Sequence, residues 1–361
     1  MLIFLLFNVK FGVIVDKRRY LWYNIMNGFV KKQEEGDYMK YCFIINPRAG
    51  KGKFVDELEK NINDTCSEAK VEFEIFKTYT LEDGREYINK TVKEYDGRLV
   101  FFACGGDGTL CGTIISVMGL DEETKKRVSV GIVPKGTGND FVSNFTNKEL
   151  FCDIKAQIDG SDYDIDLLKC NDLYSVNMIN IGFDCHVVCK KEEIGKKKIV
   201  PRKLAYIVSL LVTLIKKPTV SFESSLDGGE RQKKDLLLTT IANGAFCGGG
   251  FHSNPLASLT DGNLDCIEAQ NMSRTRFLAL VGDYKNGKHL QDKFNGIIDN
   301  FKCKTADIYF DEITPVSVDG EIIREREIHI SVISKALTII LPNGVKPLIS
   351  GGAVNDVSYS V

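Results

Sequence analysis

Strand-like runs alternate with helix-like segments in the first half of the chain. The strand-like runs cover residues 41–45, 71–75, 99–103 and 128–133. Apolar residues recur at helical spacing in the three stretches between them, at 54–66, 87–95 and 110–118. Strands that alternate with helices form parallel sheets, because each helical crossover returns the chain to the same end of the sheet. Residues 39–158 are therefore predicted to form an open, doubly wound α/β domain.

Three glycine-rich loops each follow one of these strands, at 46–53, 105–109 and 134–140. Ligands of such domains bind outside the carboxyl ends of the strands, so the three loops are expected at one edge of the sheet. Glycine lets the backbone approach a ligand closely, and a helix N-terminus offers free N–H groups; together they suit a polyphosphate. An ordinary tight turn is the alternative for residues 106–108.

The candidate nucleotide contacts come from these loops and from the end of the second strand at the same edge. Basic side chains beside glycines suit phosphate contacts. No P-loop consensus occurs, and no G-x-G-x-x-G segment opens a helix, which argues against a standard dinucleotide-binding fold. The candidates are Asn46, Arg48, Gly50, Lys51, Thr78, Gly105, Gly106, Asp107, Gly108, Thr109, Gly136, Thr137 and Asn139.

The pattern in the second half of the chain predicts many strands and few helices. Strand-like segments cover 163–169, 173–181, 218–226, 235–243, 263–269, 303–310, 314–318, 327–333 and 336–341. Helical spacing is seen only at 203–216 and at 274–290, where Ser273 is a candidate N-cap. Residues 159–345 are therefore predicted to form a β-rich domain, an antiparallel sandwich. We expect residues 346–361 to pack back on the first domain, and residues 1–38 to be an extension of uncertain order.

Two acidic turns in the second half are candidates for chemistry. Asp319-Gly320-Glu321 follows a strand and could be a hairpin turn, or could supply a general base and a metal contact. Asp261-Gly262-Asn263 is equally a hairpin turn or an oxygen-rich site for Mg²⁺. Both alternatives stay open on the residues alone.

Composition limits the partners of the chain. The net charge is −2 over 361 residues, which gives no general attraction to nucleic acid. Eleven cysteines without C-x-x-C spacing indicate reduced thiols in the cytoplasm. The apolar run at 1–7 is too short to span a bilayer, so no transmembrane segment is expected. A basic cluster at 190–203 precedes the helix at 203–216; this pair is either a contact for an anionic lipid surface or an ordinary core-facing helix.

Four motifs resemble those of a known family when they are taken in order. N-P-x-x-G stands at 46–50, G-G-D-G-T at 105–109, G-T-G-N-D at 136–140 and D-G-E at 319–321. Their order and approximate spacing resemble the diacylglycerol kinase catalytic domain, a group that includes soluble bacterial lipid kinases, sphingosine kinases and ceramide kinases. The resemblance covers about residues 39–345.

The resemblance implies a nucleotide cleft between the two domains. Asn46, the 105–109 loop and Thr137 would contact ATP. Asp107 and Asp140 would belong to a water-mediated Mg²⁺ network.

The same resemblance assigns roles in the second half. Asp261 matches an aspartate at a structural Mg²⁺ site, where backbone carbonyls complete the shell. Glu321 or Asp319 would be the base that takes the hydroxyl proton, and we favour Glu321.

Some positions depart from the family pattern. Bacterial relatives usually continue G-G-D-G-T with x-N-E, where this chain has Leu110, Cys111 and Gly112, and they usually carry an arginine near Ser143. These changes bear on the identity of the acceptor substrate and on catalytic efficiency more than on the fold.

The function expected from the sequence is an ATP- and Mg²⁺-dependent lipid kinase. It would transfer the γ-phosphoryl group to the hydroxyl of a diacylglycerol-like lipid at a membrane surface, giving a phosphatidic-acid-like product. A cytoplasmic location with peripheral membrane association follows, and a homodimer is left open. The alternatives are an NAD kinase and a catalytically weak regulator that binds nucleotide or lipid.

Overall fold

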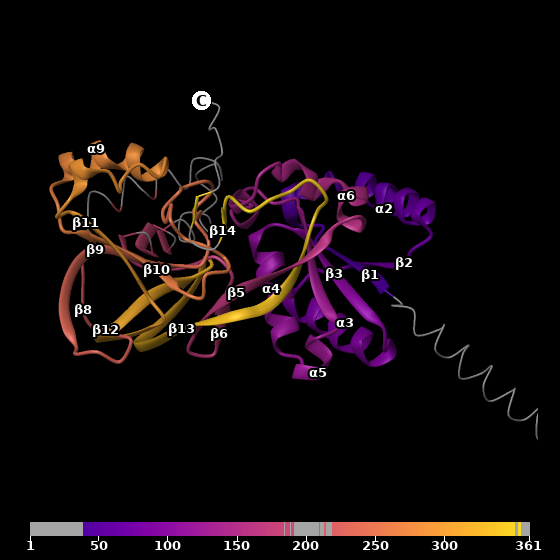
Figure 1. The fold of residues 1–361 in the computed structure, drawn as a ribbon, viewed down its shortest axis with the longest axis horizontal. Helices are drawn as coiled ribbons and strands as arrows, with labels where there is room; N and C mark the ends of the chain where they lie inside the picture. The colour runs from indigo at the N-terminus through magenta and orange to yellow at the C-terminus, as the bar shows by residue number, and fades with distance from the viewer. Residues whose placement is uncertain are drawn as a thin grey trace, which may run out of the picture.

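The computed structural model describes residues 39–183, 185–187, 189–190, 209, 213, 219–350 and 353–354. An α/β half and a β-rich half lie side by side (Figure 1). The two-part fold class predicted from the sequence is therefore confirmed. The expectations for residues 1–38, and for most of the basic cluster and the helix at 203–216, fall outside the described residues.

Four parallel strands form the sheet of the α/β half. They are β1 (Met39–Ile45), β2 (Glu72–Lys77), β3 (Arg98–Gly105) and β4 (Val128–Pro134). Their order across the sheet is β4-β3-β1-β2, with all neighbours parallel. The strands β3 and β4 are buried almost throughout, as expected of parallel strands covered on both faces, whereas the edge strand β2 alternates in exposure.

Helices cover both faces of this sheet. One face packs against α3 (Leu81–Glu94) and α4 (Asp107–Met118), and the other against α2 (Val55–Ala69) and α6 (Ile154–Ile158). The remaining short helices are η1 (Ala49–Gly52), α5 (Glu122–Lys125), η2 (Phe141–Asn144) and η3 (Lys148–Cys152). Because each helix presents one apolar stripe to the sheet, the doubly wound arrangement follows from the spacing in the sequence.

The β-rich half is antiparallel around its own apolar core. Its strands are β5 (Ser161–Cys170), β6 (Leu173–Ser175), β7 (Met178–Gly182), β8 (Val220–Leu226), β9 (Gln232–Ala242), β10 (Leu264–Gln270), β11 (Ile298–Cys303), β12 (Thr305–Val318) and β13 (Glu321–Leu341). The helix α9 (Arg274–Lys285) covers one side, and η4 (Asp292–Phe294) follows it. The predicted N-cap is confirmed, because the Ser273 side chain accepts a hydrogen bond from the Arg276 N–H.

The long strand β13 joins the two halves. It pairs with β12, then with β5, and its Ile339 lies in parallel register with Val130 of β4. The sequence predicted two separate strands here, at 327–333 and 336–341. The structure has one strand whose register shifts between Ile333 and Leu337, because an irregularity bends a strand without ending it.

The end of the described chain returns to the α/β half. Phe145 and Pro347 form a β-bridge, and the Leu348 N–H donates to the Asn144 carbonyl at 2.8 Å. The two short strands β14 (Ile349–Ser350) and β15 (Ala353–Val354) follow. Among the described residues, no helix is long and apolar enough to cross a membrane.

Candidate active site

The second and third glycine-rich loops meet backbone to backbone. A Cβ placed on Gly136 would lie 2.4 Å from the Gly106 Cα, and the Lys135 N–H donates to the Gly105 carbonyl at 2.6 Å. A side chain at either glycine would push these loops apart. The two motifs are therefore glycine-rich for a packing reason that the sequence alone did not show.

Asp107 fixes the third loop from the first turn of α4. Its two carboxylate oxygens accept from the N–H groups of Asn139 and Asp140, each at 2.8 Å. The Asp140 carboxylate in turn accepts from the N–H groups of Gly249 and Gly250, at 2.8–3.1 Å. Because Gly249 and Gly250 belong to the β-rich half, this chain of contacts ties the loops to the second half of the molecule.

Asn46 ties the first loop to the second. Its side-chain amide donates to the Thr109 hydroxyl at 3.0 Å, and its side-chain oxygen accepts from the Arg48 N–H at 3.0 Å. Gly50 has a left-handed backbone (φ 51°), and a Cβ there would lie 2.6 Å from the Lys135 carbonyl oxygen. All three loops thus form one connected surface at the carboxyl edge of the sheet.

This surface carries groups that suit an anion. Within the described part of the chain, no hydrogen bond engages the backbone N–H of Gly106, Asp107 or Gly108, which open α4. No ion pair among the described residues engages the basic side chains around them, which are Arg48, Lys51, Lys53 and Lys135. Unengaged N–H groups at a helix N-terminus, together with unpaired cations, favour phosphate.

Two other predicted nucleotide contacts lie at this edge. The Thr78 hydroxyl is buried and donates to the Thr80 carbonyl at 2.6 Å, so toward a ligand it is limited to accepting a hydrogen bond. Thr137 is exposed in the third loop.

The acidic turn at 319–321 is a tight hairpin turn between β12 and β13. Val318 pairs with Glu321, and the two central residues are left-handed, with φ of 47° at Asp319 and 89° at Gly320. Two left-handed central residues are typical of a type I′ turn. The hairpin interpretation is therefore correct for the geometry, and the chemistry depends on where each carboxylate points.

The two carboxylates of this turn have different surroundings. Asp319 accepts four hydrogen bonds, from the Ser175 hydroxyl and from the N–H groups of Val176, Asn177 and Met178, at 2.7–3.1 Å. Burial raises the pKa of Asp319 to about 6, against the opposing effect of these donors. Glu321 is exposed. Asp319 thus anchors the turn, and Glu321 has the freer carboxylate.

This turn lies close to α4, because Asp319 accepts from Ser175 at the end of β6, and β6 contacts α4. Burial raises the pKa of Cys111, and the neighbouring carboxylates of Asp319, Glu321 and Asp107 raise it further. One carboxylate from the phosphate-binding edge and both carboxylates of the turn are therefore near enough to affect the pKa of this thiol. Sequence spacing could not show this, because more than 200 residues separate Cys111 from the turn.

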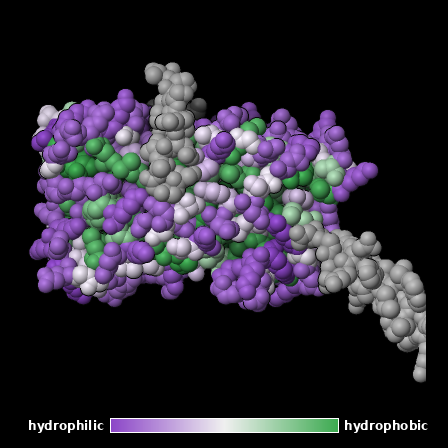
Figure 2. Space-filling view, viewed as in Figure 1, coloured by the Kyte–Doolittle hydropathy of each residue, from purple (hydrophilic) through white to green (hydrophobic). Residues whose placement is uncertain are grey.

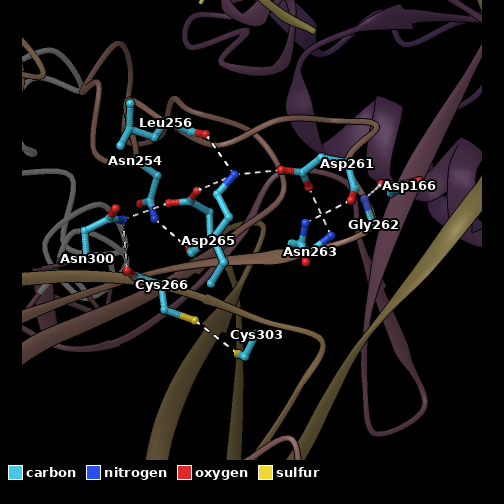
Figure 3. Close-up of polar contacts among 11 residues, drawn as sticks. Asp166, Asn254, Leu256, Asp261, Gly262, Asn263, Asp265, Cys266, Asn300 and Cys303 are labelled. Atoms are coloured by element: carbon cyan, nitrogen blue, oxygen red, sulfur yellow. Dashed lines mark hydrogen bonds and ion pairs between the residues drawn. The ribbon is translucent and has the colours of Figure 1, made fainter. Parts of the chain in front are cut away.

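The second acidic turn is neutralised by a lysine. The Asp261 and Asp265 carboxylates point toward one another (Figure 3). The Lys302 ammonium lies 2.6 Å from Asp261 Oδ2 and 3.4 Å from Asp265 Oδ2. The other Asp261 oxygen accepts from the Asn263 N–H at 3.0 Å. The Lys302 ammonium occupies the place between the two carboxylates where a cation would bind, so these residues as placed do not fit the structural Mg²⁺ that the resemblance implies.

We expect Lys302→Met to destabilise the protein by about 2 kcal/mol. The change leaves the two largely buried carboxylates of Asp261 and Asp265 facing each other without a cation. Because Lys302 is partly exposed, the loss should be smaller than for a fully buried ion pair. The melting temperature should fall by several degrees, and added MgCl₂ should restore part of it. Lys304→Met, at an exposed lysine two residues away, is the matched control. Equal melting temperatures for the two variants would contradict this account.

Three groups that build the site were missed from the sequence. The Gly248–Gly250 run, whose φ values are 62°, 84° and 101°, was a visible signal that went unused. The buried Asp166 accepts from the Gly262 N–H at 2.7 Å and from the Lys335 N–H at 2.8 Å, and so holds the second acidic turn to β13. Asp166 and Lys302 carried no local signal, since their partners lie far away in the chain.

Comparison with known families matches both halves of the molecule. The profile of the diacylglycerol kinase catalytic domain matches residues 40–170, and that of the YegS C-terminal NAD kinase beta sandwich-like domain matches residues 177–341. A provisionally named lipid kinase from Staphylococcus epidermidis is 30% identical over 248 residues, which cover 67% of this chain and 76% of that protein. The chain belongs to the diacylglycerol kinase catalytic domain family. It is thus a member of a kinase family, and the resemblance found in its motifs is confirmed.

A second curated relative and a solved structure are also similar to this chain. A diacylglycerol kinase from Mycobacterium tuberculosis is 28% identical over 248 residues, covering 66% of this chain and 75% of that protein. The crystal structure of a provisionally named diacylglycerol kinase from Bacillus anthracis has a TM-score of 0.65 at 23% identity, covering 84% of this chain and 97% of that chain. The structural similarity supports the fold.

Proposed function

We propose that this protein is a lipid kinase that transfers the γ-phosphoryl group of ATP to the hydroxyl of a diacylglycerol-like lipid. The observation that carries the proposal is the contact between β6 and α4. Asp319 accepts from the Ser175 hydroxyl at the end of β6, so the turn that carries the exposed Glu321 lies beside the helix whose N-terminal N–H groups are unengaged. Phosphoryl transfer needs these two parts, a cradle for the phosphates and a base for the attacking hydroxyl.

The protein would catalyse the reaction mainly by positioning the substrates. The N–H groups of Gly106, Asp107 and Gly108 and the surrounding cations would hold the phosphates of ATP. Glu321 would accept the proton of the acceptor hydroxyl as its oxygen attacks the γ-phosphorus, and ADP would leave with the electrons of the broken P–O bond. Asp319 would hold the turn that carries Glu321.

The Mg²⁺ that accompanies ATP fits the first half of the site. Each oxygen of Asp107 accepts one N–H group, which leaves lone pairs of that carboxylate for water. Asp107 and Asp140 would therefore hold a hydrated Mg²⁺ through water. The bound ion would neutralise charge on the phosphates.

An apolar region in the β-rich half favours a lipid acceptor. A cavity of about 20 Å³ lies between β9, β10 and α9, lined by apolar side chains that include Phe183, Leu237, Phe251, Met272, Phe277 and Leu280. Hydrophobic residues also gather on the surface just below α9, at the left of the view (Figure 2). The cavity has room for little more than a water molecule, so an acyl chain would enter only with an outward shift of α9.

The apolar cavity adjoins the phosphate edge. Phe251 lines the cavity and directly follows Gly250, whose N–H donates to the Asp140 carboxylate. A lipid with its chain in this region would have its headgroup near the glycine-rich loops. A dinucleotide acceptor has no such need for apolar surface, which is why a lipid is proposed here over NAD.

Transfer of radiolabelled phosphate from ATP tests the proposal. Diacylglycerol, monoacylglycerol, sphingosine, ceramide and phosphatidylglycerol would be offered in mixed micelles, and NAD in solution, each with MgCl₂. We expect label in diacylglycerol or a close analogue. Label in NAD alone would contradict the lipid assignment, and ATP binding without transfer to any acceptor would favour a regulator.

A further inference from the structure

The candidate groups follow one another along the carboxyl edge of the sheet. The strand order β4-β3-β1-β2 places the third loop first, then the second loop, the first loop and finally the end of β2. Asp319 accepts from the Ser175 hydroxyl at the end of β6, and β6 contacts α4, the helix that follows β3; the turn that carries Glu321 therefore lies on the phosphate side of this row. A nucleotide with its γ-phosphate near Glu321 would therefore extend toward the end of β2.

The span of this row suits a nucleoside triphosphate. Neighbouring strands lie about 4.8 Å apart, so β4 and β2 are separated by about 14 Å. That is close to the length of an extended nucleoside triphosphate. With its phosphates on the loops after β3 and β4, its base would lie beside the residues that follow β2.

An exposed aromatic side chain stands at that end. Tyr79 directly follows Thr78 and is 53% exposed, and Leu81, two residues later, is 57% exposed. Five large hydrophobic residues are exposed among the described residues, and two of them are these near neighbours. No hydrogen bond or ring contact of the Tyr79 side chain occurs within the described residues.

The backbone under Tyr79 is held in place even though its ring is exposed. The Asp83 carboxylate accepts from the N–H groups of Tyr79 at 2.9 Å and Thr80 at 3.0 Å, as part of a capping box that opens α3. Leu81 packs against α4, because a Cβ placed on Gly112 would lie 2.4 Å from Leu81 Cδ2. An exposed ring on a fixed backbone loses little freedom when a flat ligand stacks on it.

We propose that Tyr79 is the stacking platform for the adenine base of ATP, and so a residue that determines the affinity for the nucleotide. The proposal rests on the proposed function, since it takes ATP as the ligand of the loops.

Calorimetric titration of the full chain with ATP and with inorganic tripolyphosphate, both with MgCl₂, tests this assignment. Loss of a base–aromatic stack weakens binding by one to two orders of magnitude. We expect Tyr79→Ala to raise the Kd for ATP about tenfold and to leave the Kd for tripolyphosphate unchanged. Tyr79→Phe keeps the ring and should bind ATP like the unmodified protein. Leu278→Ala, at an exposed apolar residue on α9, is the matched control.

The results separate this inference from the proposed function. An unchanged Kd for ATP in Tyr79→Ala, with the unmodified protein binding ATP normally, would overturn the stacking role alone. A parallel loss of affinity for ATP and tripolyphosphate would also overturn it, because the effect would then reach the phosphate loops. Absence of ATP binding by the unmodified protein would remove both the proposed function and this inference.

Discussion

Glu321→Gln should lower kcat for phosphate transfer by about 10²–10⁴-fold, the usual contribution of a general base. Glutamine keeps the size of the side chain and the hairpin turn but cannot take the proton of the acceptor hydroxyl. Glu321 is exposed, and its side chain makes no hydrogen bond or ion pair with the described residues, so the melting temperature should not change. Steady-state transfer of radiolabelled phosphate to the best acceptor would give kcat, and calorimetry the Kd for ATP, which should stay the same.

Glu325→Gln is the matched control for this experiment. Glu325 is an exposed glutamate on the same strand, four residues from Glu321, and should tolerate the change with full activity. If Glu321→Gln kept the kcat of the unmodified protein, Glu321 would not be the base. A large loss in both variants would point instead to a general effect of negative charge on this strand.

Local spacing was enough to predict the first half of the fold. The alternation of strands and helices between residues 41 and 133 predicted β1 to β4, their parallel orientation and the shared edge of the loops, because those features depend on residues close together in the chain. The glycine motifs were also visible. Their contacts with each other, such as Gly106 against Gly136, needed the structure.

The sequence could not show the contacts that join distant segments. The partner of Asp261 is Lys302, and the N–H groups that hold Asp140 belong to Gly249 and Gly250. The continuous strand β13 was predicted as two, since its irregularity near Lys335 resembles a strand end in the sequence. Such pairings depend on how the chain returns across the sheet, and a single sequence carries no periodic signal for them.

The two members of the 319–321 turn illustrate this limit. The sequence left Asp319 and Glu321 as competing candidates for the base. The structure separates them by their contacts, because the donors to Asp319 lie more than 140 residues earlier, from the end of β6 to the start of β7. The two roles can be told apart by experiment, because a change at Asp319 should lower the stability of the protein and a change at Glu321 only its activity.

Asp319→Ala should reduce the free energy of unfolding by about 4 kcal/mol. It removes the acceptor of four hydrogen bonds and leaves three buried N–H groups, at residues 176–178, without a partner. In a protein of this size the loss should lower the melting temperature by about 10 °C, measured by circular dichroism. Activity should fall as well, but through loss of the turn that carries Glu321.

Asp311→Ala provides the comparison on the same strand, since Asp311 is exposed and should tolerate alanine. Asp319→Asn is the more discriminating variant. Its amide keeps one acceptor oxygen and the shape of the side chain, so it should recover part of the stability and, with it, part of the activity. If Asp319→Asn were as stable as the unmodified protein but as inactive as Glu321→Gln, Asp319 would act in the chemistry itself, and the assignment of the base to Glu321 would have to be withdrawn.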